Sequence, residues 1–497
     1  MIIDLAVLQN AMNSIKPTGN PITDFAIGRQ KAALLKKYCG SSGVSEEASR
    51  QAIDKFLTSN EKCKGMIIDE ISTLVRDVRA QLALWLQGFD FIDCYLQYAD
   101  VGNGANRLSQ SADIWGKFST MSSTKESLVK LSALLFSSEQ AKSVPGLSPG
   151  TCFAHVKGSR VTVVPKTLTI GRLVCTEPTA NMLAQKAIDG FIRHVLKTRV
   201  GIDMSRQPEL NKLAAWCGSV GRIYATIDLE SASDSISLAL CRAVLPHTFQ
   251  LFLEKVRCER TELPDGTLVD LHMISTQGNG FNSSLQTIIF AAIVNAVCCR
   301  ASVRSRAPTM VFGDDIIVDK LNYDGVTQAL HTLGFTVNPA KSFSRGNFRE
   351  SCGGDYLCGI DVRPISIKSL ETRADVYTAI NLLRNWARYH SVEIFPVLRV
   401  LRKALGKHRE VVPYGVPSYR GIYGLRRQCK EVVRSDAFGD SYCLAYVGLE
   451  PRIAKARKIT DTSALLLACI GTGRMVNDPS TSKPLLTEKR SEVRWVR

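Results

Sequence analysis

The chain has 497 residues, which at about 150 residues per domain is length for roughly three domain-sized units. Apolar residues make up 45% and charged residues 22%, so a disordered chain is excluded, and ordinary glycine and proline contents exclude collagen-like and linker proteins. The formal net charge is +17. So much positive charge indicates a polyanionic partner, of which nucleic acid is the commonest.

Cysteine usage and hydropathy indicate the compartment. The 15 cysteines are scattered and include no C-x-x-C pair, so no spacing predicts a zinc site or a disulfide scaffold. No basic segment precedes an apolar one at the start, so no signal peptide is predicted. The longest apolar stretch, residues 288–299, is broken by Asn295 and is too short to span a bilayer. We expect a reduced, soluble, intracellular protein without a membrane segment.

The first half of the chain changes from a helical to a strand-like pattern. The first 150 residues read as mostly helical, with the clearest helix over residues 69–86 and a loop over 143–151. Short segments rich in Val and Thr follow over 153–174, which predicts strands. Four basic residues punctuate them, and these are Lys157, Arg160, Lys166 and Arg172.

The later elements are predicted from periodicity and turn residues. In chain order they are a strand over 222–229, a helix from about Ser235, a helix over 281–297, two strands within 309–318, a helix over 327–333 capped by Gly334, and basic helices beyond about 366.

The most informative motif lies between the two strands of 309–318. Phe312 is followed by Gly313, Asp314 and Asp315, and a two-residue loop that begins with Gly suits a type II′ hairpin. Two adjacent carboxylates among apolar residues repel each other unless a cation neutralises them. Mg²⁺ favours one or two carboxylates plus substrate phosphates. The alternative is a solvated acidic turn.

A second acidic group lies upstream. Asp228 ends the predicted strand over 222–229, and Asp234 follows six residues later. An acid that ends one strand and an acid pair in a neighbouring hairpin can converge, and three carboxylates there would hold two metal ions about 3.5–4 Å apart. Taken alone, Asp228 is more often a helix cap or turn acid.

A polar, glycine-containing loop lies between these two groups. Residues 275–280 read Ser-Thr-Gln-Gly-Asn-Gly and lead into the helix over 281–297. Two glycines in three residues allow close backbone approach to a ligand, and the side chains at the helix entry can contact a sugar or a phosphate. The alternative is a tight loop before a core helix.

Together these motifs resemble the palm of a viral RNA-dependent RNA polymerase. The closer resemblance is to the replicase β subunits of positive-strand RNA bacteriophages, the leviviruses. It covers about residues 158–390, and the strings that carry it are ATIDLESASDSIS, GNGF, VFGDDIIV, GFTVNPAKSF and FRESCGGDYLCGIDV. It implies an α+β, right-hand polymerase with fingers, a palm with an antiparallel sheet, and a helical thumb.

The resemblance also implies domain limits. They are 1–150 for an N-terminal and fingers region, 151–220 for fingers with a basic NTP-contacting motif, 221–365 for a palm with motifs A to E, and 366–497 for a helical, basic thumb and C-terminal region.

Catalytic roles carry over onto matching positions. Asp228, Asp314 and Asp315 are expected to bind two Mg²⁺ ions, for which Mn²⁺ can substitute. Lys341 resembles the lysine that protonates the pyrophosphate leaving group, and its alternative is an ordinary surface lysine. Asp234 resembles the acid that helps to read the ribose 2′-OH.

Nucleotide-binding roles follow in the same way. Lys166 and Arg172 match the basic motif over the incoming triphosphate, and Arg suits phosphate because its planar fork binds two oxygens. The remaining expected NTP contacts are Ser275, Gly278 and Asn279. Lys157 and Arg160 are as well explained as solvated charges, and residues 348–361 resemble motif E, which supports the growing 3′ end.

The chain departs from the family pattern in two places. Phe312 stands where many relatives carry Tyr. The Thr and Asn that usually follow the motif B glycine at fixed offsets are replaced here by Asn282 and Gln286. Which amide, including Asn279, pairs with Asp234 in sugar selection is therefore left open.

The window 399–434 is unusually basic. It holds ten Lys or Arg against two Glu, with three interleaved tyrosines, a combination that suits a single-stranded RNA track. As a thumb it would grip the template–product duplex by its shape. The alternative is a solvated helix face. The residues expected to contact RNA are Arg402, Lys403, Arg420, Arg426 and Arg427.

The sequence therefore predicts an RNA-directed RNA polymerase that replicates a positive-strand viral genome. The alternatives are a reverse transcriptase-like polymerase, against which Asp234 argues, and a non-catalytic viral RNA-binding protein, which would have no use for Asp314. The expected partners are RNA template and product, NTPs and, by resemblance, the host translation elongation factors Tu and Ts and in some members a ribosomal protein. The expected location is the cytoplasm of the bacterial host.

Overall fold

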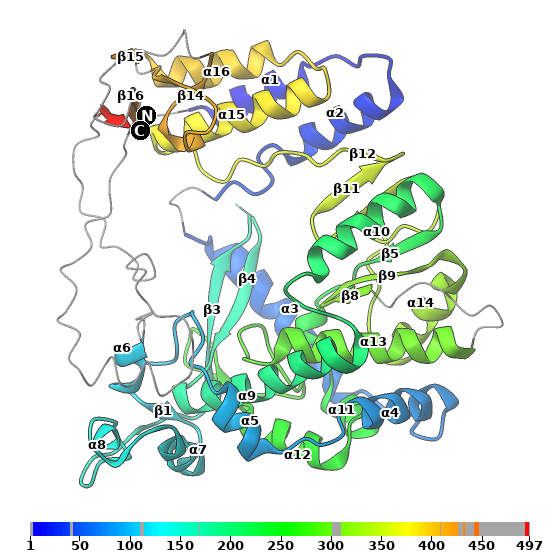
Figure 1. Cartoon of the computed structure of the whole chain (residues 1–497), viewed down its shortest axis with the longest axis vertical. Coiled ribbons are helices and arrows are strands. Elements are labelled where there is room, and N and C mark those ends of the chain that lie inside the picture. Colours follow the sequence, from blue (N-terminus) through cyan, green and yellow to red (C-terminus); the bar gives the residue numbers. More distant parts are fainter. Residues whose placement is uncertain are drawn as a thin grey trace.

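The computed structural model describes residues 3–39, 43–109, 114–167, 169–300, 310–407 and 409–425, with short strands at 431–432, 442–446 and 493–496. Helices and mainly antiparallel strands are mixed along the chain, which confirms the predicted α+β class (Figure 1). Two of the predicted RNA contacts, Arg426 and Arg427, lie outside the described residues.

A three-stranded antiparallel sheet lies near the middle of the molecule (Figure 1). Its order is β5 (Tyr224–Ile227), β9 (Asp315–Asp319) and β8 (Met310–Phe312). This is the antiparallel sheet that the sequence predicted, and β8 and β9 form the expected hairpin.

Alternate residues of this sheet face two different helices, as the two-residue period of a strand requires. Ile316 and Val318 belong to the large core that contains α13 (Asn282–Arg300). Ile317, between them, packs instead against Ala214 of α10 (Gln207–Gly221). Helices therefore cover both faces of the sheet. Charged residues lie at one end of the sheet, at its β8–β9 turn.

The large core lies below the sheet in Figure 1. Its other helices are α4 (Thr73–Trp85), α5 (Phe91–Tyr98), α9 (Thr179–Val195), α11 (Leu238–Val244), α12 (His247–Val256) and α14 (Tyr323–Thr332). In α4 the buried residues are Val75, Val78, Leu82 and Trp85, a helical spacing that places one apolar stripe on the core.

α13 is the core's central helix and is apolar on nearly every side. A stretch of 18 of its 19 residues has a mean hydropathy of 1.5, so by length and composition it could cross a membrane, although the apolar stretch seen in the sequence is shorter. The helix packs against α4, α9 and α14, and 72% of that stretch is buried inside the protein. This packing and this degree of burial are typical of a helix in the core of a folded domain.

A second core forms the upper layer in Figure 1 and joins the N-terminal helices to residues between Phe348 and Ile422. It packs α1 (Leu5–Asn13) and α2 (Pro21–Ala33) against α15 (Arg373–Tyr389) and α16 (Phe395–Leu405). The first 150 residues, taken from the sequence as one region, are thus divided. Residues up to Leu34 pack with the predicted thumb, and the following helices pack elsewhere.

A long hairpin rises beside the central sheet, backed by one N-terminal helix. β3 (Ser159–Pro165) and β4 (Gly171–Thr176) pair within the sheet β4-β3-β6-β7, completed by β6 (Arg260–Glu262) and β7 (Leu268–Asp270). α3 (Glu46–Lys64) packs on this sheet through Phe56 and Cys63 (Figure 1).

Several short elements also belong to the described fold. They are α6 (Ile114–Phe118), β1 (Ser122–Ser123), α7 (Glu126–Ser132), α8 (Ser138–Ala141), β2 (Ala154–His155), the 3₁₀ turn Ala232–Asp234, β10 (Phe348–Ser351), β11 (Gly354–Leu357), β12 (Ile360–Asp361), β13 (Val411–Val412), β14 (Ile422–Tyr423), β15 (Glu431–Val432), β16 (Tyr442–Tyr446) and β17 (Val493–Val496). Beyond α16 the described residues form strands and turns, so the last α-helix in the part of the chain that the structure describes ends at Leu405.

Element boundaries differ from the predicted ones where a cap decides them. The helix predicted over 69–86 begins at Thr73 because the Ser72 side chain accepts a hydrogen bond from the Val75 N–H. The helix predicted from about Ser235 begins at Leu238, capped by Ser237. Gly334 follows α14 with a φ of +93°, as the predicted C-cap requires.

One ion-pair group joins the upper layer to the β10–β11 hairpin. The Arg29 guanidinium on α2 contacts the Asp355 carboxylate, lies 3.4 Å from that of Glu350, and stacks 4.7 Å from the Phe348 ring. The Asp355 side chain is only 7% exposed, so it depends on this partner.

We expect Arg29→Met to lower the free energy of unfolding by about 2–3 kcal/mol, because it leaves a buried carboxylate unpaired. Thermal unfolding of the full chain measures this. Arg50→Met is the matched control, since its pair with Glu47 is 68% and 64% exposed and such pairs contribute about 0–1 kcal/mol. Equal effects of the two substitutions would contradict the assignment.

Candidate active site

Sheet register brings the three predicted carboxylates to one end of the central sheet. Ile227, the last residue of β5, pairs with Ile316 of β9, so Asp228 lies opposite Asp315 as the next pair outward. Opposed residues of an antiparallel pair have Cα atoms about 4.5–5.5 Å apart. Asp314 occupies the adjoining turn with Gly313, whose φ is +58°. The positive φ is confined to the first turn residue, as a type II′ hairpin requires.

The pKa values report how closely these acids interact. Burial raises the pKa of Asp314, and the neighbouring charges of Asp315 and Asp228 raise it further. Burial also raises the pKa of Asp228, although Lys341 and Asn338 act in the opposite direction. Both acids are half-buried and resist ionisation, which is the condition that a bound cation would relieve.

Each of two carboxylates is held by neighbours from a different segment. Asp228 accepts hydrogen bonds from the Asn338 side chain (3.0 Å) and from Lys341 Nζ (3.3 Å). Asp315 Oδ1 accepts from Ser351 Oγ and the Cys352 N–H, both at 3.0 Å. Sequence analysis identified Lys341 but not the other three holding groups.

The donor set fits a hard divalent cation, because it consists of carboxylate oxygens whose mutual repulsion a cation offsets. Within the described residues, however, no three His, Cys, Asp or Glu side chains are arranged around one point as a metal site. The hydrogen bonds explain this, since Asp228 faces Asn338 and Lys341 while Asp315 faces the β10–β11 turn.

Lys341 contacts the site directly. Burial opposes its charge, but Asp228, Glu350 and Asp314 outweigh burial and raise its pKa, so the ammonium is protonated at neutral pH. Its Nζ ion-pairs with Asp228 while its side chain stays 49% exposed. A protonated amine beside the acids can serve as a proton donor.

Lys166 and Arg172 lie at the upper end of the β3–β4 hairpin. Arg172 pairs with Val164 across the strands, and the Lys166 N–H bonds to the Ile170 carbonyl at the turn. Burial lowers the pKa of Lys166, as do the nearby cations Arg172, Lys341 and Lys55, whereas Asp228 raises it. The hairpin therefore brings positive charge to the acids.

The glycine-containing loop is pinned against the strand that carries Arg172. The Cys175 N–H bonds to the Gln277 carbonyl at 2.7 Å. Gly278 has a φ of +116°, and a Cβ there would stand 2.1 Å from the Cys175 carbonyl oxygen, so only glycine fits. Asp234 joins the same junction, because its carboxylate accepts from the Gln277 N–H at 3.3 Å.

The amides of this region bond to one another and to backbone. Asn279 caps the turn before α13 by accepting from the Phe281 N–H, Ser275 Oγ bonds to Asn282 Oδ1, and Gln286 Nε2 bonds to the same oxygen. The Asp234 carboxylate instead accepts from the Gln277 N–H and interacts with the Ser233 side chain. The sugar-reading amide that the sequence left open therefore stays open.

Comparison with known proteins decides the family. A sequence model described as RNA replicase, beta-chain, matches residues 3–470. The RNA-directed RNA polymerase beta chain of Enterobacteria phage fr is 30% identical over 99% of this chain and 93% of its own length. The corresponding subunit of Escherichia virus Qbeta is 31% identical over 79% and 68%, respectively. That of Escherichia phage MS2 is 31% identical over 77% and 73%.

The chain belongs to the RNA replicase β-chain family. Among solved structures, similarity is more distant. An RdRp complex is 12% identical, with a TM-score of 0.39 over 67% of this chain and 33% of that one. An insertion-loop deletion mutant of a human picorbirnavirus RNA-dependent RNA polymerase is 10% identical, with a TM-score of 0.40 over 71% and 76%.

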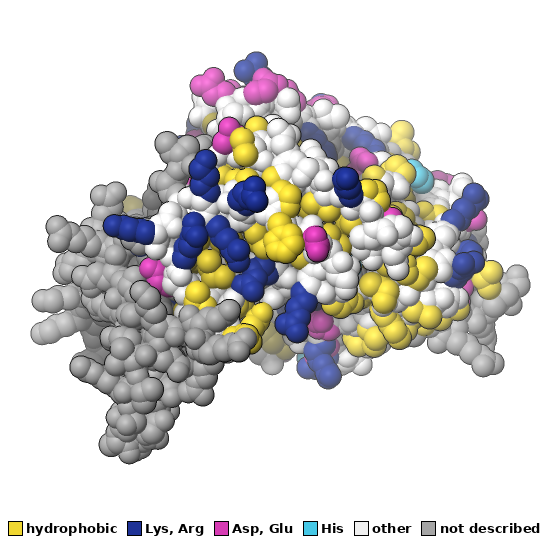
Figure 2. All heavy atoms as spheres, turned by 90° about the horizontal axis from the view of Figure 1, so that it is seen from above, with side chains coloured by type: hydrophobic (Ala, Val, Ile, Leu, Met, Phe, Trp, Pro, Cys, Tyr) yellow, Lys and Arg dark blue, Asp and Glu magenta, His cyan; other side chains and the backbone are white. Residues whose placement is uncertain are grey.

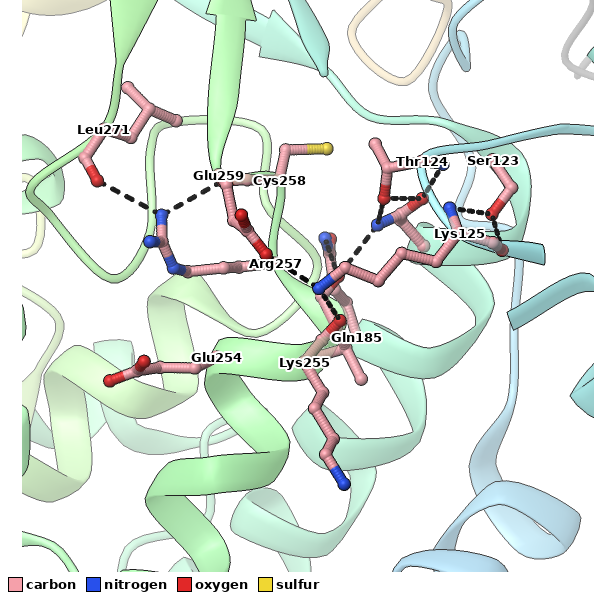
Figure 3. Close-up of polar contacts among 12 residues, drawn as sticks. Ser123, Thr124, Lys125, Gln185, Glu254, Lys255, Arg257, Cys258, Glu259 and Leu271 are labelled. Carbon is pink, nitrogen blue, oxygen red and sulfur yellow. Dashed lines mark hydrogen bonds and ion pairs between the residues drawn. The ribbon is translucent and has the colours of Figure 1, made fainter. Parts of the chain in front are cut away.

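A buried polar network in this replicase supports the glycine-containing loop through Gln185, which lies beside the segment of Lys255 and Arg257 in Figure 3. Gln185 of α9 is fully buried and accepts from the Gly280 N–H at 2.9 Å. Its Nε2 donates to the Glu177 carboxylate (2.9 Å) and to the Val256 carbonyl (3.2 Å). Burial raises the pKa of Glu177. Nothing in the sequence distinguishes Gln185 from an ordinary helix glutamine.

The predicted RNA contacts that the structure describes lie away from the acids. Arg402 and Lys403 are exposed on α16, in the upper layer, where Lys and Arg side chains gather (Figure 2). Arg420 is half-buried in a 3₁₀ turn, with its guanidinium 5.8 Å from the Tyr419 ring.

The raised pKa of Asp234 predicts that the stability of the protein depends on pH. Burial raises its pKa to about 6, so ionising it costs stability as pH rises from its unfolded value near 4 through 6. We expect Asp234→Asn to be more stable than the parent by about 3 kcal/mol at pH 8 and equal to it near pH 4. Thermal unfolding across this pH range measures the difference, and a constant difference at all pH values would contradict the shift.

Gln185→Leu is expected to destabilise the fold by about 1–3 kcal/mol, because it leaves the Glu177 carboxyl and the Gly280 N–H buried without this partner. The KM for NTP should rise as well, since the loop of residues 275–280 loses its support. The control is Gln51→Leu, whose amide bonds to Glu47 at the surface. Unchanged unfolding in both variants would disprove the supporting role.

Proposed function

We propose that this RNA-directed RNA polymerase forms phosphodiester bonds at the end of the central sheet, with Asp228, Asp314 and Asp315 as the catalytic acids. The activity class follows from the family. The proposed position of the active site is supported by the register of β5 and β9. This register sets Asp228 beside the β8–β9 turn, although the acids are nearly ninety positions apart in the sequence.

The three acids would hold two Mg²⁺ ions, or Mn²⁺ in their place. Such a pair lowers the pKa of the attacking 3′-hydroxyl and stabilises the pyrophosphate leaving group. The raised pKa values of Asp228 and Asp314 support this role, because carboxylates that resist ionisation alone gain most from a cation.

The remaining residues of the site bind, orient and supply a proton. Lys166 and Arg172 bind the triphosphate from the β3–β4 hairpin. Asp234 reads the ribose beside the loop of Ser275, Gly278 and Asn279. Lys341 holds a proton beside Asp228 and donates it to the pyrophosphate oxygen that leaves.

RNA and host proteins are the proposed macromolecular partners. Arg402, Lys403 and Arg420 would contact template or product phosphates, together with Arg426 and Arg427. The relatives come from phages of enterobacteria, so the bacterial cytoplasm is the proposed site of action. Elongation factors Tu and Ts, and a ribosomal protein, are the proposed host subunits.

Asp314→Asn tests the proposed acids. We expect primed NTP incorporation on an RNA template to fall by about three or more orders of magnitude, because a metal ligand is lost, while RNA affinity stays unchanged. Glu230→Gln is the matched control, since Glu230 is exposed and lies two residues beyond Asp228. Full activity of Asp314→Asn would reject the site, and preferred dNTP incorporation by the parent would indicate reverse transcription.

A further inference from the structure

One exposed lysine of the N-terminal region lies between the elements of the proposed nucleotide site. Lys55 is on α3, and Ala48 and Lys62 lie seven residues before and after it. Seven residues are nearly two helical turns, so these three share one face of α3 at intervals of about 10 Å. Within the described part of the chain, no hydrogen bond or ion pair of the Lys55 side chain is found.

The contacts of Ala48 and Lys62, which flank Lys55 on this face of α3, show which elements lie near Lys55. At one end, the Ala48 carbonyl oxygen would be 3.0 Å from a Cβ on Gly171, the residue before Arg172 on the hairpin. At the other end, Lys62 Nζ bonds to Thr336 Oγ1 at 3.1 Å. The Thr336 carbonyl in turn accepts from the Glu230 N–H, two residues beyond Asp228.

α3 also reaches the ribose-reading acid. It contacts the 3₁₀ turn that contains Asp234, and Cys63 Sγ lies 3.9 Å from the Asp234 carbonyl oxygen. Lys55 therefore lies on α3 between the β3–β4 hairpin, which carries Lys166 and Arg172, and the turns that follow Asp228. Its charge acts on both sides, since it lowers the pKa of Lys166 and opposes the rise in that of Asp234.

The charges around Lys55 show what would fit there. Three other cations, Lys55, Arg172 and Lys341, lie near enough to Lys166 for their charges to lower its pKa. Among the residues that the structure describes, only Lys341 of these four cations has a carboxylate partner, Asp228. Like charges held together are unfavourable until a polyanion joins them, and a nucleoside triphosphate carries nearly four negative charges in one short chain.

We propose that Lys55 binds the triphosphate of the incoming nucleotide, so that α3 forms one wall of the NTP site. This rests on the proposed function and assigns a nucleotide contact to the N-terminal region. Removing it should weaken binding in the ground state and the transition state alike, so KM should rise and kcat should stay nearly constant.

The experiment compares Lys55→Met with Lys64→Met in the full chain purified with its host partners. Lys64 is exposed on the same helix and pairs with Glu61, so it is matched in type and element. We expect the KM for all four NTPs to rise roughly tenfold in Lys55→Met, with kcat within about twofold of the parent, and no change in Lys64→Met. Lys55→Arg should restore most of the affinity.

A binding measurement separates this inference from the proposed chemistry, because it needs no turnover. Fluorescence titration with mant-ATP and mant-AMP should show a loss of affinity for the triphosphate and little change for the monophosphate. Equal losses for both probes would overturn the inference, as would a loss of RNA affinity with an unchanged KM for NTP. Unchanged binding of mant-ATP by Lys55→Met would overturn it as well, even if Asp314→Asn abolishes synthesis.

Discussion

Repulsion between carboxylates is the constraint around which the rest of the replicase is arranged. The β5–β9 register fixes Asp228 against Asp315 and sets Asp314 in the adjoining turn. Hydrogen bonds from neighbouring residues then reduce the electrostatic repulsion between the carboxylates. Lys341 and Asn338 donate to Asp228, and the β10–β11 turn donates to Asp315. The site is thus held by polar partners from two segments, residues 338–341 and 351–352, and a change in either is expected to alter how the acids face one another.

The N-terminal residues connect parts of the molecule that are far apart in sequence. α2 anchors the β10–β11 hairpin through Arg29, and the same hairpin holds Asp315. α3 packs on the β3–β4 hairpin and touches the turn of Asp234. Residues 3–39 and 43–64 therefore connect the elements that carry Asp315 and Asp234 to the upper core and to the core of the β3–β4 sheet.

Sequence analysis predicted much of the fold because strand runs, turn residues and the order of motifs are local signals. The hairpin around Gly313, the strand before Asp228 and the long apolar helix before residue 300 were all predicted. The structure brings Asp228, Asp314, Asp315 and Lys341 together, and their roles stay predictions. Gln185 and Asn338 could not be found, because they have partners 95 and 110 positions away and their own surroundings in the sequence are ordinary. Lys55 could not be found because only the fold brings α3 to the β3–β4 hairpin and to the turn of Asp234. The division of the first 150 residues was missed because helical periodicity does not say against what a helix packs.

The upper core has a consequence for how this polypeptide is made. Its first members, α1 and α2, emerge from the ribosome at the start of translation, but α16 is complete only at Leu405. At bacterial elongation rates of about 5–20 residues per second, roughly 20–70 s separate the two events. During that interval the apolar faces of the two leading helices lack their final partners. The upper core can consequently form only late in synthesis, when α15 and α16 become available to pack against α1 and α2, which were made first.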